Sequence, residues 1–392
     1  MVSGVTATAR ELPHVLLFYQ ELLPSVRLCG HIQMEALERM GYIAYRHCSE
    51  HQLTQDDLNW ADIVLLGRMD DNFACDVAKW LRKNGKYLIY IIDDDLLNIP
   101  KGITSAAHYW QPSVQRNIRE MIATCHAILS PSPLLLDKYA MDGRLGLLTR
   151  EPTVAPVPYT PHDPKAPVKI GFAGSVDRAD DVRQLLGEAL QEIKALYGDR
   201  VQIEFFGFQN PLTKKLAAKA RPYCRSYEEY RAVLNEMAWD IGLAPMPDTP
   251  FHACKHYNKF VEYAAAGVVG IFSDLEPYTQ LKQDIGLGVF CENRTETWVQ
   301  AIRTLIDDRD KLEAMRRQVC ECAVSTVSAE SIALSLYDHM VAILRWRAPK
   351  NDKIYPLKRW KVLMRVQQYF LALKVYGWKI VPRTLDKLRG RA

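Results

Sequence analysis

Short apolar runs alternate with amphipathic segments along the first 150 residues of the chain. The runs that predict buried strands are HVLLFY (14–19), YIAYRH (42–47), DIVLLG (62–67), YLIYII (87–92) and AILSPS (127–132). Apolar residues recur at helical spacing between them, near 27–40, 75–83 and 113–124. Strands that alternate with helices in this way indicate a parallel, doubly wound sheet with helices on both faces.

The same alternation returns in the second half of the chain. Its predicted strands are VKIGFAGS (168–175), VQIEFFG (201–207), DIGLAPM (240–246), VVGIFS (268–273) and LGVF (287–290), with helices from about 179 and near 211–220, 227–237, 257–266 and 295–344. Residues 151–167, between the two patterns, include six prolines, which suit neither a helix nor a central strand. We therefore expect an α/β protein with two Rossmann-like doubly wound domains, residues 1–150 and 168–344, that face a cleft across a proline-rich linker.

The segment 250–273 predicts a loop, a helix that begins at Asn258 and ends at Gly267, and a buried strand. The polar residues around the start of this helix are Lys255, His256, Asn258, Lys259 and Glu262. The unpaired amides of a helix start can hold a diphosphate together with Lys255, while Glu262 can accept hydrogen bonds from the two vicinal hydroxyls of a ribose. The same spacing also fits a solvated helix face with ordinary ion pairs.

The pattern K-x-x-x-K-F-x-E-Y-x-A-x-G, which starts at Lys255, resembles the donor-binding segment of GT-B glycosyltransferases, especially the bacterial family 4-like group (glycosyl transferases group 1). The resemblance implies that Lys255 meets the diphosphate of a nucleotide-sugar donor and that Glu262 holds its ribose. Two positions depart from the family pattern, because Cys254 stands where a first glutamate is usual and Val268 replaces the usual proline. The departure at Cys254 leaves open whether transfer retains or inverts the sugar configuration.

A second donor-binding candidate follows the predicted strand at 168–175. Gly174 and Ser175 end this strand and Arg178 precedes the next helix. Glycine lets a backbone approach a phosphate closely, and the start of the following helix favours an anion. The spacing is not that of the Gly-x-Gly-x-x-Gly fingerprint, so a plain structural turn is the alternative.

Arg27 opens a helix after the first predicted strand, in a segment that resembles the first loop of some GT-B enzymes. Its guanidinium can point at a phosphate or an acceptor, and the alternative is an ordinary surface arginine at the start of an exposed helix. His108, in the loop SAAHYW, is a further candidate for the cleft.

Three adjacent carboxylates, Asp93 to Asp95, directly follow the buried strand at 87–92. Such a run persists where it is solvated, paired with cations or bound to a metal or substrate. We expect Asp93 and Asp95, with His108, to be the catalytic candidates, since a carboxylate here can orient an acceptor hydroxyl or act as a base. The run also fits the Asp-x-Asp metal site of GT-A glycosyltransferases or a helix cap, but a metal-bridged diphosphate would duplicate the site at Lys255, so we expect no metal.

The composition is that of a globular protein, because 392 residues with 48% hydrophobic residues suffice for two or three domains. Nine cysteines lie without metal-ligand or secretory spacing, which favours a reducing compartment. The N-terminus lacks the apolar core of a signal peptide, and no apolar run reaches the roughly eighteen residues of a membrane span. We therefore expect a cytoplasmic protein.

Charge is concentrated at the end of the chain, where residues 345–392 contain fourteen Lys or Arg against two acids. The cations are interleaved with Trp360, Phe370, Tyr376 and Trp378, a pattern typical of a basic amphipathic helix on an anionic membrane surface. A final helix pair that packs back on the first domain is the alternative, and both can hold. We expect no nucleic-acid partner, because no nucleic-acid motif accompanies the cations.

These expectations describe a metal-independent, hexosyltransferase-like glycosyltransferase that needs no cofactor besides its nucleotide-sugar donor. Its expected partners are the nucleotide sugar, a glycan or lipid-linked acceptor and the anionic inner face of a membrane, as in bacterial surface polysaccharide or glycoconjugate assembly. The alternative is a sugar-nucleotide-binding protein or an epimerase of the same fold.

Overall fold

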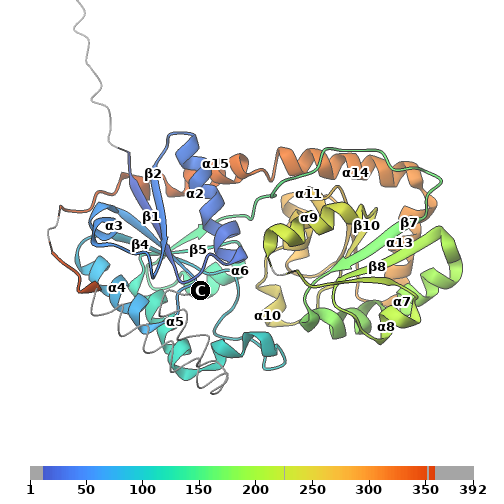
Figure 1. Cartoon of the computed structure of the whole chain (residues 1–392), viewed down its shortest axis with the longest axis horizontal. Helices are drawn as coiled ribbons and strands as arrows, with labels where there is room; N and C mark the ends of the chain where they lie inside the picture. The colour runs from blue at the N-terminus through green and yellow to red at the C-terminus, as the bar shows by residue number, and fades with distance from the viewer. Residues whose placement is uncertain (1–11, 225, 351–352, 358–392) are drawn as a thin grey trace, which may run out of the picture.

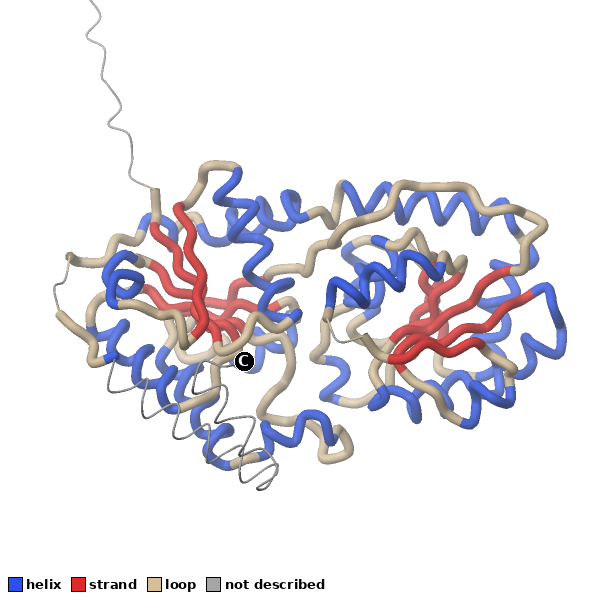
Figure 2. The backbone as a smooth tube through the Cα atoms, in the orientation of Figure 1, coloured by secondary structure: helices blue, strands red, loops and turns tan. Residues whose placement is uncertain are grey.

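The computed structural model describes residues 12–224, 226–350 and 353–357, and it contains two sheets of six parallel strands each (Figures 1 and 2). The first sheet has the order β2-β1-β3-β4-β5-β6 and consists of β1 (His14–Tyr19), β2 (Ala44–Ser49), β3 (Ile63–Gly67), β4 (Tyr87–Ile91), β5 (Ala127–Ser130) and β6 (Leu145–Leu148). Its helices are α1 (Pro24–Val26), η1 (Arg27–His31), α2 (Ile32–Arg39), α3 (Gln55–Trp60), α4 (Asn72–Lys83), η2 (Thr104–Trp110), α5 (Pro112–Thr124) and α6 (Pro133–Tyr139).

The second sheet has the order β12-β11-β10-β7-β8-β9 and consists of β7 (Val168–Ala173), β8 (Val201–Gly207), β9 (Lys219–Pro222), β10 (Ile241–Ala244), β11 (Val269–Ser273) and β12 (Val289–Cys291). Its helices and those that follow are η3 (Val176–Arg178), α7 (Ala179–Tyr197), η4 (Gly198–Arg200), α8 (Pro211–Lys215), α9 (Tyr227–Met237), α10 (Pro250–Ala253), α11 (Asn258–Ala265), α12 (Tyr278–Asp284), α13 (Thr295–Asp307), α14 (Arg309–Val324), α15 (Ala329–Met340) and η5 (Ile343–Arg345). The predicted architecture of two doubly wound α/β domains is confirmed.

The apolar runs form strands because helices cover both faces of each sheet. Every residue of β3 and of β5 is buried, as expected for central parallel strands. In the second sheet Gly171 allows the indole of Trp239 to lie against the strand, since a β-carbon there would come within 2.1 Å of the ring. Glycine at this buried position therefore lets the Trp239 ring pack directly against the backbone of β7.

The structure differs from the sequence expectation at 211–220, where one helix was expected. Helix α8 ends at Lys215, Ala217 takes a positive φ of 48°, and β9 then pairs with the edge of β8. The strand is short and mostly exposed, so it lacks the apolar alternation that identifies a strand in a sequence.

The chain crosses between the domains twice. The first crossing is the linker, and the second lies between α14, which packs on the second domain, and α15, which packs on α2 of the first (Figure 1). Ala333, Leu336 and Met340 of α15 share one apolar cluster with Met34 and Leu37 of α2. The chain therefore returns to the first domain before Leu344, where the sequence pattern ended the second domain.

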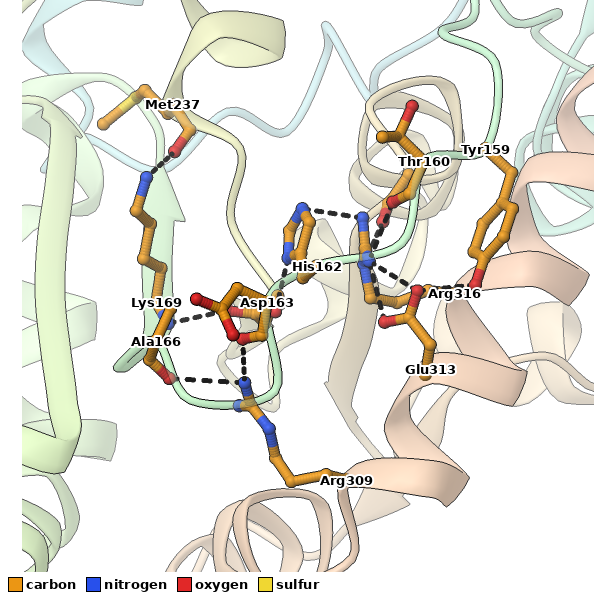
Figure 3. A network of polar contacts seen from close by, with 12 residues as sticks. Tyr159, Thr160, His162, Asp163, Ala166, Lys169, Met237, Arg309, Glu313 and Arg316 are labelled. Atoms are coloured by element: carbon orange, nitrogen blue, oxygen red, sulfur yellow. Dashed lines mark hydrogen bonds and ion pairs between the residues drawn. The ribbon is translucent and has the colours of Figure 1, made fainter.

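The proline-rich linker is fastened to the second domain rather than loose between the two. Arg316 of α14, which is 4% exposed, donates hydrogen bonds to the carbonyl oxygens of Thr160 and Gly267 and to Glu313 (Figure 3). Its Nη2 also lies 2.8 Å from Nε2 of His162, whose Nδ1 lies 2.6 Å from the Asp240 carboxylate. The linker from about 159 onward is thus part of the second domain.

The described part of the basic tail packs on the first domain. Trp346 donates a hydrogen bond of 2.9 Å to the carbonyl oxygen of Gly85, and Tyr355 is buried against Phe73 and Trp80. The tail residues expected to contact a membrane, Trp360, Phe370, Tyr376 and Trp378, lie outside the described residues.

No single helix among the described residues has the length and apolar composition to cross a membrane. Helices α14 and α15 pass that test only as a pair, with a bend of 54° between them.

Candidate active site between the two domains

The loops at the carboxyl ends of the two sheets meet between the domains. A pocket there is lined from the first domain by Pro131–Leu134 and from the second by Lys255, His256 and Tyr257, with Glu276, Pro277 and Gln280 beside them. Helix α10 crosses to the first domain, where Phe251 and Cys254 join its apolar cluster. The segment 250–257 is therefore held by both domains.

Lys255 and the acidic run after β4 meet across this gap. The Lys255 ammonium lies 2.7 Å from Oδ1 of Asp94, and each side chain is about three-quarters buried. Although burial opposes ionisation, the positive charges of Lys255 and Arg68 lower the pKa of Asp94 below its usual value. Two segments that sequence analysis selected independently thus form one ion pair.

Asp93 faces the first domain instead of the second. Its carboxylate accepts hydrogen bonds of 2.9 and 3.0 Å from Arg68, which also donates to the hydroxyls of Tyr109 and Ser25. Burial raises the pKa of Asp93 against the opposing effect of Arg68. Arg68 was not among the sequence candidates. It directly follows β3, however, so like the acidic run it lies at the carboxyl end of a buried strand, where ligands of such sheets bind.

Asp95 is 1% exposed and its oxygens are occupied by neighbours from its own domain. It accepts hydrogen bonds from Lys138 at 2.6 Å, from Asn98 at 2.9 Å and from the Tyr139 hydroxyl. A carboxylate enclosed in this way ties α6 to the β4 loop. These contacts are structural, and the catalytic role expected for Asp95 stays a prediction.

His108 is oriented by a carboxylate that sequence analysis missed. Its Nε2 lies 2.9 Å from Oδ2 of Asp70, while the residue remains half-buried on η2. This hydrogen bond raises the pKa of His108 above its usual value, against the effect of burial. Within the part of the chain that the structure describes, Nδ1 of the ring has no hydrogen-bond partner, which leaves it available to a ligand.

Glu262 lies on the first two turns of α11 and is already hydrogen-bonded. It accepts from Lys259 at 2.6 Å and from the Tyr230 hydroxyl at 2.7 Å, and its backbone carbonyl accepts from Arg231 at 2.8 Å. Tyr230 in turn stacks on Phe206 with ring centroids 5.0 Å apart. An aromatic surface therefore adjoins the carboxylate that was expected to hold a ribose.

Gly207, the last residue of β8, lets the end of β8 lie close to the turn after β7. Gly207 has a φ of 111°, and a β-carbon at this position would come within 1.9 Å of the carbonyl oxygen of Gly174. Arg178 donates to the carbonyl oxygen of Pro245 at 2.8 Å and pairs with Asp181 at 3.0 Å. Ser175 makes no capping bond at the start of η3.

Two of the expected donor and acceptor residues have other partners in the structure. The guanidinium of Arg27 pairs with Glu228 of α9, which adds another ion pair between the domains. His256 does not supply a positive charge, because burial lowers its pKa to about 3. Its Nδ1 lies 2.6 Å from the side-chain oxygen of Asn258, and within the described structure its Nε2 has no partner.

The residues of the described chain offer no group of three His, Cys, Asp or Glu side chains arranged to hold a metal ion. The three adjacent carboxylates are instead each paired with a different cation, namely Arg68, Lys255 and Lys138.

No protein-family model matches the sequence, and no curated protein sequence matches it. Solved structures share the fold. HepE of Anabaena, in complex with UDP and glucose, has a TM-score of 0.56 and 11% sequence identity, covering 84% of this chain and 100% of that chain. The lipopolysaccharide outer core galactosyltransferase WaaB has a TM-score of 0.50 and 11% identity, covering 84% and 100%. A UDP-N-acetylglucosamine 2-epimerase from Listeria monocytogenes, described as putative, has a TM-score of 0.50 and 12% identity, covering 88% and 100%. The likeness shows a GT-B fold for this chain.

Proposed function

We propose that the protein is a glycosyltransferase that moves a sugar from a nucleotide-diphosphate sugar to a glycan or lipid-linked acceptor. The observation that carries this proposal is the meeting of Lys255, at the loop before α11, with the carboxylate loop of the first domain at 2.7 Å. It brings a cation, the start of a helix and acceptor-side carboxylates into one cleft. The ligands of the structural neighbours, UDP and glucose in HepE, agree with this chemistry.

The donor would bind on the second domain. Its diphosphate would take the place of the Asp94 carboxylate at Lys255 and would face the amides at the start of α11. Glu262 would exchange its Lys259 and Tyr230 contacts for the hydroxyls of the ribose. These groups would also offset the charge that develops on the leaving diphosphate, so a divalent metal would not be needed.

The acceptor would bind against the first domain. Asp70 holds His108 so that Nδ1 can take a proton from an acceptor hydroxyl, which is the role of a general base. Asp93 is the second candidate for this role, but its pairing with Arg68 favours orientation of the acceptor over proton transfer.

The assay for this function uses the purified protein, a panel of labelled UDP-sugars, and oligosaccharide and lipid-linked acceptors. Transfer of label to an acceptor, retained in EDTA, is the expected result. A strict requirement for Mg²⁺ or Mn²⁺ would contradict the metal-independent mechanism.

A second candidate function is a sugar-nucleotide epimerase, which the structural likeness to the Listeria protein favours. Conversion of the labelled sugar without any acceptor would support the epimerase. Binding without either reaction would leave a sugar-nucleotide-binding protein.

We also propose that the basic tail, residues 345–392, attaches the protein to the anionic inner face of a membrane. Each cation near such a surface contributes about 1 kcal/mol, so a few of the fourteen suffice for reversible binding. Co-sedimentation with vesicles containing anionic lipid should be strong at low salt and weak at high salt, and it should be lost in a chain ending at Ala348. Equal sedimentation of the two chains would contradict this attachment.

A further inference from the structure

Glu151, at the start of the linker, is a buried carboxyl group between the two domains that neither the sequence pattern nor the proposed mechanism uses. It is 2% exposed. The thiol of Cys29 donates to its Oε1 at 3.4 Å from the first domain, and the Asn258 side chain donates from the second. Among the described residues no cation is paired with it. A buried carboxyl group without a cation is costly to ionise.

The charges around Glu151 also oppose its ionisation. Asp93 approaches it from the loop after β4 and Glu262 from α11, and both carry negative charge. The cations paired with these two carboxylates are Arg68, which binds Asp93, and Lys259, which binds Glu262, and neither forms an ion pair with Glu151. Burial first and then Asp93 raise the pKa of Glu151 to about 8, although the hydrogen bonds from Cys29 and Asn258 act in the opposite direction.

The linker holds both ends of α11, the helix that would carry the donor diphosphate. At its first residue, Asn258 is hydrogen-bonded to Glu151, and Asn258 also accepts from His256 at 2.6 Å. At its last residue, the carbonyl oxygen of Ala265 accepts a hydrogen bond of 2.8 Å from the backbone of Val157. The linker therefore contacts both ends of α11.

We propose that Glu151 is kept as a neutral carboxylic acid and acts as a positioning residue, which fixes the start of α11 through Asn258 and permits a diphosphate to bind there. Ionisation of Glu151 adds a third negative charge beside Asp93 and Glu262. This charge would lie next to the donor's diphosphate and would repel it. Donor binding is therefore coupled to the protonation of Glu151. This inference rests on the proposed donor site.

The first arm of the test measures thermal unfolding and needs no ligand. Because the folded protein retains a proton that the unfolded chain releases, Glu151 makes stability fall as the pH rises from about 4.5 to about 8. Glu151→Gln keeps the shape and the neutral state, so the difference in Tm between this variant and the unmodified protein should grow across that range. Glu236→Gln, an exposed carboxyl on α9, is the matched control and should change nothing.

The second arm measures calorimetric affinity for UDP between pH 7 and 9.5. Above the pKa of Glu151, the affinity of the unmodified protein should fall by up to about tenfold per pH unit relative to Glu151→Gln, which should stay level. Glu151→Ala, which removes the contact to Asn258, should bind UDP weakly at every pH.

Each outcome decides the inference. If Tm changes with pH in parallel for the unmodified protein and Glu151→Gln, Glu151 is not kept neutral. If UDP affinity changes with pH in parallel for the two proteins, the protonation of Glu151 is not coupled to donor binding. Absence of UDP binding at any pH would instead count against the proposed function, while the Tm arm would still report on Glu151. If Glu151→Ala fails to fold, the Glu151→Gln comparison is sufficient.

Discussion

At the scale of single residues, the proposed donor site depends on one cation, Lys255, and one carboxylate, Glu262. Lys255→Ala removes a charge-assisted contact to the diphosphate, and Glu262→Ala removes the hydrogen bonds to the ribose. Each change should weaken UDP binding by about 1.5–3 kcal/mol. Calorimetry measures this loss, and unchanged affinity in both folded variants would remove the basis of the site.

His108 gives the proposed transfer a characteristic pH dependence. A general base must be unprotonated, so activity should rise with pH through the pKa of His108, which Asp70 raises above its usual value. Asp70→Asn removes the raising charge, so the acid limb of the pH–rate profile should move to lower pH while the maximal rate falls. The contribution of the Asp70–His108 pair to the free energy of unfolding depends on pH in the opposite direction. It is present at low pH, where His108 is protonated, and is lost as His108 deprotonates. An acid limb that does not move in Asp70→Asn would exclude His108 as the base.

At the scale of elements, the linker and α14 form one unit through Arg316. Arg316→Ala would leave the carbonyl oxygens of Thr160 and Gly267 without this donor and would remove the cation beside Glu313, so we expect a loss of about 1–3 kcal/mol in the free energy of unfolding. Arg294→Ala, which removes an exposed ion pair with Glu292, is the control and should have little effect. Urea denaturation measures both, and equal midpoints would show that the linker does not need this clamp.

The sequence predicted the elements whose patterns are strong and missed those that depend on distant neighbours. The buried strands and the helix at 227–237 were predicted from periodicity alone, and the helix is confirmed to the residue. The edge strand β9 was missed because pairing with β8, rather than apolar alternation, makes it a strand.

In the site, Lys255 and the acidic run could be selected as candidates because the first precedes a buried helix and the second follows a buried strand. Their direct contact was not, since the two are 161 positions apart and only the packing of the domains joins them. Glu151 gave no signal, because a glutamate at a linker carries no pattern and its burial arises from both domains together.

At the scale of the whole molecule, the domains are joined by ion pairs, and a donor would have to replace the one between Lys255 and Asp94. Asp94 competes with the diphosphate for Lys255, so Asp94→Asn should free that cation and strengthen UDP binding by about 1 kcal/mol. The same variant should favour a more open arrangement of the domains, measurable as a larger radius of gyration by small-angle X-ray scattering. Weaker UDP binding in Asp94→Asn would show that Asp94 helps to form the site and does not compete for it.

The return of α15 to the first domain affects the order of folding during synthesis. The ribosome completes the first sheet early. The apolar face of α2, with Met34 and Leu37, is covered only when α15, with Ala333, Leu336 and Met340, has been synthesised. At about 5–20 residues per second, the intervening linker and second domain take on the order of 10–40 s to synthesise. During that interval the nascent first domain presents an uncovered apolar stripe, the kind of surface that chaperones bind.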